Sequence, residues 1–295
     1  MNELNILLST DRNYIPQLNT LLHSLFCNNR DCKFQIHVLH SSLDEADISI
    51  IDRVVRHYDG SLFTYKITPN NDSETMTKKT RLPMETYYRL LCMNHLPESI
   101  DKVLYLDCDI IINGSLEPLF DIDLTGYLFA AADDYVEVIG KNSEPTARQR
   151  AVIDQYIPKT CRYVNSGVLL INLESLRKVI TTEEIITKID EYGDVLVWHD
   201  QDFINYHFYE HILHLDCTLY NYFPVYWYWE ELKPGKPVII HFAGVFKPWK
   251  EDYFSRCEPF AVAYQERTRP FIRQAKELYE KYAEMPYLDK STFSV

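Results

Sequence analysis

The first third of the chain alternates short apolar runs with amphipathic stretches. Apolar residues dominate 4–8, 34–39 and 62–67, and short runs bounded by polar residues are typical of strands. Between these runs, residues 15–26 and 48–55 carry apolar side chains at the spacing of a helix face. Strands that alternate with helices predict a parallel sheet joined by right-handed crossovers.

The pattern continues around residues 102–106 (KVLYL), a largely apolar run that we expect to be a central strand buried on both faces. Further strands are predicted over 127–132, 167–172 and 238–241, and further helices over 84–94, 174–190, 201–209 and 258–284. Residues 68–81 are polar and rich in turn formers, so we expect a surface loop there. No linker divides the chain, and we predict one α/β domain with a C-terminal helical elaboration.

Composition narrows the classes of function. Hydrophobic residues make up 46% and charged residues 25% of the 295 positions, as in ordinary globular proteins. The formal net charge is −13 and there is no basic stripe, which excludes a nucleic-acid-binding module because such a module must attract phosphates. The seven cysteines are scattered without a Cys-x-x-Cys pair, which argues against a zinc ribbon or a disulfide framework and favours a reducing cytoplasm.

Two aspartates directly follow the predicted central strand. Side chains two positions apart in an extended chain point the same way, so Asp107 and Asp109 would share one crevice at the strand's carboxyl end. Open α/β sheets bind ligands at that edge. A divalent cation would remove the repulsion between the carboxylates, and their oxygens suit Mg²⁺ or Mn²⁺. The simpler alternative is a helix cap beside a turn aspartate.

A candidate third ligand ends the predicted strand 238–241. This residue, His241, is followed by Gly244 and Lys247 in the segment HFAGVFKPWK. The histidine would complete the metal shell and favour Mn²⁺, and the lysine ammonium would reach a phosphate beyond a flexible glycine. The alternative is a histidine bound to a loop carbonyl and a lysine in solvent.

With these motifs the sequence resembles the family 8 glycosyltransferases, retaining enzymes of the GT-A fold that include glycogenin and bacterial lipopolysaccharide galactosyltransferases. The likeness covers about residues 4–250 and rests on the ordered segments LLSTDRNY, ETYYRL, KVLYLDCDIIINGSLEPLF, AAADD, YVNSGVLLINL, HDQDFIN and HFAGVFKPW. It implies a Rossmann-like, mixed but mainly parallel sheet flanked by helices. The nucleotide-sugar-binding catalytic domain would occupy residues 1–255, and a C-terminal helical tail residues 256–295.

The resemblance also implies a role for each residue that matches a family motif. The ligands of Mn²⁺, or alternatively Mg²⁺, would be Asp107, Asp109 and His241. The uracil and ribose would contact Thr10, Asp11, Asn13 and Tyr14. Asp107 and Cys108 would also bind the substrate, and Gly244 and Lys247 would close over the diphosphate. The donor sugar would be surrounded by Asn165 and Ser166 and by the catalytic residues Arg89, Asp133, Asp200 and Gln201.

Several of these residues also have simpler structural interpretations. Asp11 could cap a helix, and Arg89 could bridge a surface acid. The acids at 200–202 could serve only to start a helix, near its positive dipole end, and residues 165–167 could form a turn. The aromatic stretch 220–229 could be core packing or a platform for the apolar face of an acceptor sugar.

The predicted function is Mn²⁺-dependent transfer of glucose or galactose from a UDP-sugar to an acceptor hydroxyl, and the family resemblance implies retention at the anomeric carbon. Gln201 is a poor nucleophile, so we favour front-face attack over a covalent intermediate, although Asp200 lies beside it. A sugar nucleotidyltransferase should carry a glycine-rich loop after its first strand, and LLSTDRNY contains no glycine. A catalytically silent nucleotide-sugar-binding protein should have lost a metal ligand, and none is lost.

The ends of the chain bear on its location. The N-terminus lacks a basic region, and no run of about 18 apolar residues occurs, so we expect neither signal-peptide export nor a transmembrane segment. Membrane-associated relatives often end in a basic amphipathic tail, whereas residues 259–295 intersperse acids and bases without a dense cationic stripe. We therefore expect a cytoplasmic protein with at most weak peripheral contact with a membrane.

Overall fold

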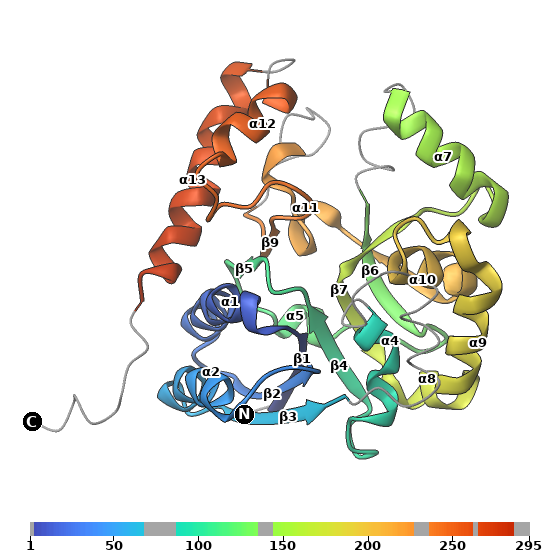
Figure 1. The fold of residues 1–295 in the computed structure, drawn as a ribbon, viewed down its shortest axis with the longest axis horizontal. Coiled ribbons are helices and arrows are strands. Elements are labelled where there is room, and N and C mark those ends of the chain that lie inside the picture. Colours follow the sequence, from blue (N-terminus) through green and yellow to red (C-terminus); the bar gives the residue numbers. More distant parts are fainter. Residues whose placement is uncertain (1–2, 68–86, 135–143, 227–235, 262–264, 286–295) are drawn as a thin grey trace, which may run out of the picture.

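A seven-stranded sheet organises the fold (Figure 1). The computed structural model describes residues 3–67, 87–134, 144–226, 236–261 and 265–285. The sheet contains β1 (Glu3–Ser9), β2 (Lys33–His40), β3 (Ser61–Lys66), β4 (Lys102–Leu106), β6 (Phe129–Asp133), β7 (Val164–Asn172) and β8 (Ile212–Leu215). Their order across the sheet is β3-β2-β1-β4-β7-β6-β8.

Most neighbouring strands of this sheet are parallel. β1 pairs in parallel with β2 and β4, β2 with β3, and β6 with β8. β7 runs antiparallel to its two neighbours, β4 and β6. The predicted mixed, mainly parallel α/β sheet is therefore confirmed.

Helices cover both faces of the sheet (Figure 1). The α-helices of the described residues are α1 (Ile15–Asn28), α2 (Glu45–His57), α4 (Tyr88–Leu91), α5 (Glu117–Phe120), α7 (Glu144–Tyr156), α8 (Leu173–Val179), α9 (Thr182–Tyr192), α10 (Asp200–Phe208), α11 (Cys217–Tyr220), α12 (Tyr253–Ala261) and α13 (Gln265–Ala283). Successive side chains of β4 enter opposite cores, because a strand alternates its faces. Leu104 and Leu106 pack with α1 and α2, whereas Val103 and Tyr105 pack with α4, α8, α9 and α10.

A second, two-stranded sheet joins segments that are far apart in the sequence. It pairs β5 (Ile110–Ile112) with β9 (Ile239–His241) in antiparallel fashion, with Ile110 opposite His241. Phe242 N extends the contact by donating a hydrogen bond to Asp109 O at 3.0 Å. The residues that follow β4 are thereby fixed beside the end of β9.

The helices α12 and α13 pack over this small sheet in a third apolar core, which includes Ile240 of β9, Tyr253 of α12 and Tyr279 of α13. Asn28 Nδ2 in α1 donates a hydrogen bond to the Tyr282 hydroxyl of α13 at 2.7 Å. The expected boundary between residues 255 and 256 falls inside α12, and the division into a domain and a tail stays a prediction.

Two predicted helices differ from the observed ones. The single helix expected over 174–190 is wrong: α8 ends at Val179, and α9 begins in a capping box that Thr181 and Glu184 form. That box satisfies the first backbone donors of a new helix, which an apolar periodicity cannot reveal. The helical segment expected over 258–284 begins earlier, because α12 starts at Tyr253, and it includes α13; residues 262–264 between the two lie outside the described residues.

Short elements and element ends account for the other differences. β5 and β8 were not predicted as strands, and α7 was not predicted as a helix. β7 begins at Val164, earlier than expected. The described part of the helix expected over 84–94 is α4 followed by a 3₁₀ turn, and the loop expected over 68–81 lies outside the described residues. Among the described residues, no helix is both long and apolar enough to cross a bilayer.

Candidate active site

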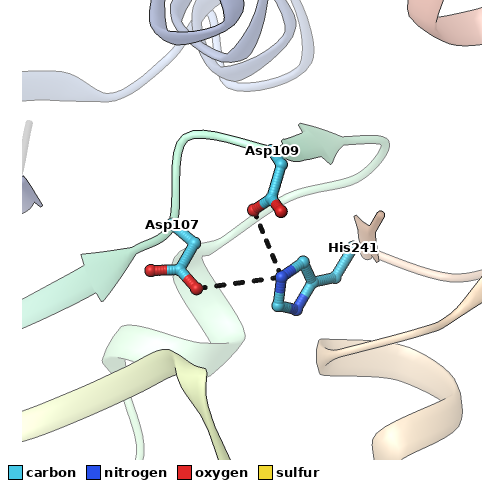
Figure 2. Close-up of side chains that lie close together, drawn as sticks. All are labelled: Asp107, Asp109 and His241. Atoms are coloured by element: carbon cyan, nitrogen blue, oxygen red, sulfur yellow. Dashed lines mark ion pairs between the residues drawn. The ribbon is translucent and has the colours of Figure 1, made fainter. Parts of the chain in front are cut away.

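Three side chains that could hold a metal ion converge at the carboxyl end of β4 (Figure 2). Asp107 and Asp109 follow the strand directly, and the β5–β9 pairing brings His241 to them. One potential ligand atom from each residue lies within 4.8 Å of the other two. The structure thus brings together the three residues that the sequence singled out for the metal.

The spacing of the three groups suits one divalent ion. His241 Nε2 lies 3.2 Å from Asp109 Oδ1 and 3.8 Å from Asp107 Oδ2. Ligands bound at about 2.1 Å to one octahedral ion lie roughly 3 Å apart when adjacent and about 4.2 Å apart when opposite. Two carboxylate oxygens and an imidazole nitrogen are also a donor set that Mn²⁺ accepts. The residues present therefore fit a divalent cation.

Gly167 of β7 preserves the space that this cluster occupies. A Cβ atom at this position would lie 2.3 Å from His241 Cε1 and 2.8 Å from Asp107 Oδ2. Asp107 N donates a hydrogen bond to Gly167 O at 2.8 Å, so the strand backbone passes directly beside the ligands. A larger residue here would have to displace one of them.

Each aspartate uses its second oxygen for a contact within the protein. Asp107 Oδ1 accepts a hydrogen bond from the Tyr105 hydroxyl at 2.7 Å and lies 3.0 Å from Arg89 Nη2. Asp109 Oδ2 accepts a hydrogen bond from Lys247 Nζ. Burial alone would raise the pKa of Asp109, but Lys247 and His241 outweigh it and hold that pKa below its ordinary value. Each carboxylate therefore keeps one oxygen directed towards His241.

Arg89 links the metal cluster to α10. The side chain is buried, and its Nε lies 3.0 Å from Asp200 Oδ2. Its Nη1 donates hydrogen bonds to Ser166 O at 2.6 Å and to Ser166 Oγ at 3.1 Å. Burial disfavours the charge, but Asp107 and Asp200 hold the pKa of Arg89 above its ordinary value. The interpretation of Arg89 as a bridge to a surface acid is therefore wrong.

A second cluster of polar side chains lies between β7 and α10. Gln201 Oε1 accepts hydrogen bonds from Asn165 Nδ2 at 2.9 Å and from Ser166 N at 3.1 Å. Gln201 Nε2 donates to Asp134 Oδ2 at 3.3 Å, as Asn165 Nδ2 does at 2.9 Å. Asn165 and Ser166 belong to β7, so their interpretation as a turn is wrong.

The structure does not bring Asp133 into this cluster. Its carboxylate lies 2.9 Å from His214 Nδ1 of β8 and 2.9 Å from Arg162 Nη1. The neighbouring Asp134, which sequence reasoning did not select, makes the contacts with Asn165 and Gln201. The two consecutive aspartates of AAADD indicated an acidic residue here, but nothing in the sequence favours Asp134 over Asp133.

The two acids at the start of α10, Asp200 and Asp202, make different kinds of contact. Asp202 Oδ2 accepts a hydrogen bond from Trp198 N at 2.6 Å, and Asp202 Oδ1 accepts one from the Tyr163 hydroxyl at 2.6 Å. Asp200 instead contacts Arg89 and Ser166. Burial raises the pKa of Asp200 to about 6, a rise that Arg89 partly opposes. The helix-start interpretation therefore describes Asp202, whereas Asp200 contacts two other residues of the predicted site.

The residues after β1 form a short turn beside the cluster. Asp11 Oδ1 accepts hydrogen bonds from Asn13 N at 2.7 Å and from Tyr14 N at 3.2 Å, which is the capping interpretation of Asp11. Tyr14 is 38% exposed. Thr10 is buried, and the Cys108 thiol donates to Ser9 O at 3.3 Å, close to the same turn.

The loop after β9 carries the remaining predicted residues. Lys247 Nζ donates to Phe242 O at 2.8 Å as well as to Asp109. Gly244 is exposed with φ +66°, a conformation that favours glycine. Trp249 contacts Tyr14 edge to face, with ring centroids 6.2 Å apart. The structure therefore places the predicted uracil and diphosphate residues side by side.

The described part of the aromatic stretch packs into the protein. Tyr222, Phe223 and Val225 are buried in the third core, and Phe223 lies edge-on to the His241 ring with centroids 5.2 Å apart. Residues 227–229 lie outside the described part of the chain. Asn221, which sequence reasoning missed, binds His241 Nδ1 through its Oδ1 at 2.8 Å.

Comparison with known proteins gives a family match over most of the chain. The sequence model of glycosyl transferase family 8 matches residues 5–253. Glycosyltransferase GlyF of Streptococcus pneumoniae serotype 4 is 28% identical over 89% of this chain, and the match covers 61% of GlyF. This chain thus spans about six-tenths of that relative's length.

Two further relatives resemble this chain along nearly their whole length. Lipopolysaccharide 1,2-glucosyltransferase of Escherichia coli is 26% identical over 97% of this chain and 86% of its own. The solved structure of galactosyltransferase LgtC, in complex with donor and acceptor sugar analogs, superposes with a TM-score of 0.71 at 24% identity. That superposition covers 96% of this chain and 98% of the other, and it shows that the two share a fold.

Proposed function

Because the chain belongs to glycosyl transferase family 8, we propose that it transfers glucose or galactose from a uridine-diphosphate sugar to an acceptor hydroxyl. The observation that carries this proposal is the convergence of Asp107, Asp109 and His241 at the carboxyl end of a central strand. Glucosyl and galactosyl transfer in the names of two relatives supports the choice of a hexose.

Asp107 Oδ2, Asp109 Oδ1 and His241 Nε2 would hold Mn²⁺, or Mg²⁺ as an alternative. When bound, the ion supplies positive charge against the diphosphate leaving group as the glycosidic bond breaks. Lys247 would add a second positive charge by moving its ammonium from Asp109 towards the phosphates. No carboxylic acid is needed to protonate a diphosphate.

Tyr14 and the turn around Asp11 would hold the nucleoside. The exposed Tyr14 ring would stack on uracil, and Trp249 contacts the Tyr14 ring edge to face. Asp11 already accepts hydrogen bonds from two backbone amides, so it would both shape the turn and accept a ribose hydroxyl. Thr10 and Cys108 lie close to the same turn. Gly244 would give the loop after β9 its freedom to close over the diphosphate.

Arg89, Asp200 and Gln201 would position the donor sugar, together with Asn165 and Ser166. Gln201 is a neutral amide held by neighbours on both of its terminal atoms, which suits orientation of hydroxyl groups better than nucleophilic attack. Asp200 Oδ2 is bound by Arg89 and Ser166, which lowers its nucleophilicity. These contacts support front-face attack with retention. Asp133 would act only if the donor reaches the His214 side of β6.

The acceptor would be a carbohydrate or glycoconjugate hydroxyl. The acidic surface of a chain with net charge −13 does not suit a nucleic-acid acceptor. Which sugar, acceptor and linkage are used depends on hydroxyl contacts, because one polar contact can change preference by orders of magnitude.

The test is a panel of UDP-sugars assayed for UDP release with and without Mn²⁺. We expect UDP release from UDP-glucose or UDP-galactose only with the ion, and none from Asp109→Asn, which keeps the buried shape but removes a charged ligand. Asp121→Asn, at a turn away from the site, is the matched control and should behave as wild type. Unchanged turnover in Asp109→Asn would remove that residue from the site.

The same panel separates the alternative functions. A sugar nucleotidyltransferase would release pyrophosphate from UTP and a sugar 1-phosphate and would leave UDP-sugars intact. A silent nucleotide-sugar-binding protein would bind UDP with Mn²⁺ but show no turnover with any donor. Either result would replace the proposed reaction.

A further inference from the structure

The terminal amide of Gln201 is held by four neighbours. Its Oε1 accepts hydrogen bonds from Asn165 Nδ2 at 2.9 Å and from Ser166 N at 3.1 Å. Its Nε2 donates to Asp134 Oδ2 at 3.3 Å and to the hydroxyl oxygen of Tyr163 at 3.2 Å. Each hydrogen atom of the Gln201 NH₂ group therefore has an acceptor of its own.

Two of these neighbours decide which way round the amide lies. A backbone N–H only donates, so Ser166 N requires the oxygen of Gln201 to face it. An ionised carboxylate only accepts, so Asp134 requires the NH₂ group on its side. Both neighbours demand the same orientation of the amide. The second hydrogen of the NH₂ group then points at Tyr163, whose hydroxyl oxygen must accept it.

The hydroxyl oxygen of Tyr163 is able to accept because its own hydrogen is used elsewhere. Tyr163 donates to Asp202 Oδ1 at 2.6 Å, and Asp202 Oδ2 accepts a further hydrogen bond from Trp198 N at 2.6 Å. Burial raises the pKa of Tyr163, and the nearby Asp202 and Asp134 raise it further, so the hydroxyl stays protonated. Tyr163 and Asp202 are 1% and 0% exposed, so bulk water does not compete for their contact.

We propose that Tyr163 is a positioning residue that, with Asp202 bound to its hydroxyl, holds the Gln201 amide in the orientation it needs beside the donor sugar. The proposal rests on the proposed function, in which Gln201 positions that sugar. Phenylalanine at position 163 would fill the same space before β7. It would leave one hydrogen of the Gln201 NH₂ group without this acceptor, which costs more than the hydrogen bond alone.

The expected consequence concerns the rate of transfer more than the affinity for the donor. A loosely held amide still lies beside the bound donor, but it spends less time in the geometry that the reaction requires, and small displacements of such groups are costly. Loss of the Tyr163 hydroxyl should therefore lower kcat and leave KM for the UDP-sugar nearly unchanged.

Tyr163→Phe tests this expectation, because it removes the hydroxyl and keeps the ring. We expect kcat to fall about five- to tenfold, the factor that corresponds to one neutral hydrogen bond, with KM within about twofold of wild type. Glutamine-selective ¹⁵N labelling gives a second readout without any substrate. The NH₂ signals of Gln201 are assigned from their absence in Gln201→Glu. In Tyr163→Phe they should shift and exchange faster with solvent, because one N–H has lost its acceptor.

A double-mutant comparison shows whether Tyr163 acts through Gln201. Gln201→Ala removes the amide, so adding Tyr163→Phe to that variant should change kcat by less than about twofold. A role of Tyr163 that is independent of Gln201 would lower kcat by the same factor in both backgrounds.

Tyr282→Phe is the matched control for a merely structural effect. Tyr282 is also buried, and its hydroxyl also accepts a hydrogen bond from a side-chain amide, Asn28 Nδ2 at 2.7 Å, but it belongs to the contact between α13 and α1. We expect both tyrosine variants to lose stability. Only Tyr163→Phe should change kcat and the Gln201 signals.

The proposal is overturned if Tyr163→Phe keeps the kcat and the Gln201 signals of wild type, or if it lowers kcat equally in the Gln201→Ala background. The wild type gives a test that does not depend on the folding of any variant. Its Gln201 NH₂ group should exchange with solvent more slowly than that of the exposed Gln274, and equally fast exchange would also overturn the proposal. If the wild type released no UDP from any donor, the proposed function would fail, while the Gln201 signals would still test Tyr163.

Discussion

Arg89 Nη2 lies 3.0 Å from Asp107 Oδ1, the carboxylate oxygen that faces away from His241. The same guanidinium contacts Asp200 and Ser166, so one buried cation joins a metal ligand to residues around the proposed sugar site. Its planar group meets all of these acceptors at once, which a lysine ammonium cannot do. The guanidinium also lies 4.3 Å from the centre of the Tyr105 ring.

Replacing Arg89 by methionine should therefore destabilise the fold as well as the site. The change leaves Asp107 and Asp200 buried without their shared cation, and removing one partner of a buried ion pair costs about 3–5 kcal/mol. We expect a loss of this size in the free energy of unfolding, measured by urea denaturation. Lys188→Met, which breaks an exposed pair with Glu191, is the control and should be indistinguishable from wild type. Equal stability of Arg89→Met and wild type would contradict the central role of Arg89.

Asp200 should make the stability of the protein depend on pH. Burial raises its pKa to about 6, so between about pH 4 and pH 6 the folded protein binds more protons at this site than the unfolded chain does. The free energy of unfolding therefore falls as the pH rises through that window. The free energy of unfolding falls by about 1.4 kcal/mol per pH unit in that window. The total loss reaches about 3 kcal/mol and is constant above pH 6.

Asp200→Asn, which cannot ionise, should remove this contribution. We expect the variant to gain up to about 3 kcal/mol relative to wild type when urea denaturation at pH 7.5 is compared with pH 4. The lost contact with Arg89 adds an offset, so the change between the two pH values is the diagnostic quantity. At Asp123 the hydrogen bonds from Thr125 lower the pKa, so this group titrates below pH 4 and Asp123→Asn should show little change between the two pH values. A flat difference for Asp200→Asn would show that its carboxyl group titrates normally.

The position of the metal cluster follows partly from local sequence and partly from long-range pairing. Asp107 and Asp109 could be placed because an apolar strand directly precedes them, and the strand sets where they point. Convergence with His241 depends on the pairing of β5 with β9, two strands of three residues each. Strands so short leave little pattern in the sequence, and only the strand end before His241 suggested its role.

The choice between Asp133 and Asp134 could not be made from the sequence. The pairing of β6 with β7 shifts register between Ala131 and Asp133, which breaks the simple alternation of faces. Asn221 was missed for a related reason. Its contact with His241 follows from the bridge between Tyr222 and Ile240, and a run of aromatic residues gives no sign of that bridge.

Gly167→Ala should damage the metal site more than the fold. The added Cβ would approach His241 Cε1 to 2.3 Å, so the imidazole must move away from the carboxylates. We expect at least a tenfold loss of Mn²⁺ affinity by EPR titration, in line with the loss caused when a ligand is no longer held in place. Gly60→Ala, which would press on Phe26 Cζ at 2.8 Å in the α1–α2 core, is the matched control. Both variants should lose stability, and a normal Mn²⁺ affinity in Gly167→Ala would show that the ligands tolerate the displacement.

Lys276 of α13 should influence the donor site although it lies in the predicted tail. Its Nζ donates to Pro248 O at 2.8 Å, and Tyr279 of the same helix packs on Trp249 with ring centroids 5.5 Å apart. Both contacts hold the loop that carries Lys247. Lys276→Met keeps the apolar stem and removes the hydrogen bond, so we expect KM for the UDP-sugar to rise about three- to tenfold, equivalent to roughly 1 kcal/mol, with little change in kcat. Lys281→Met, farther along α13, is the control. If residues 256–295 were an independent appendage, both variants would match wild type in KM.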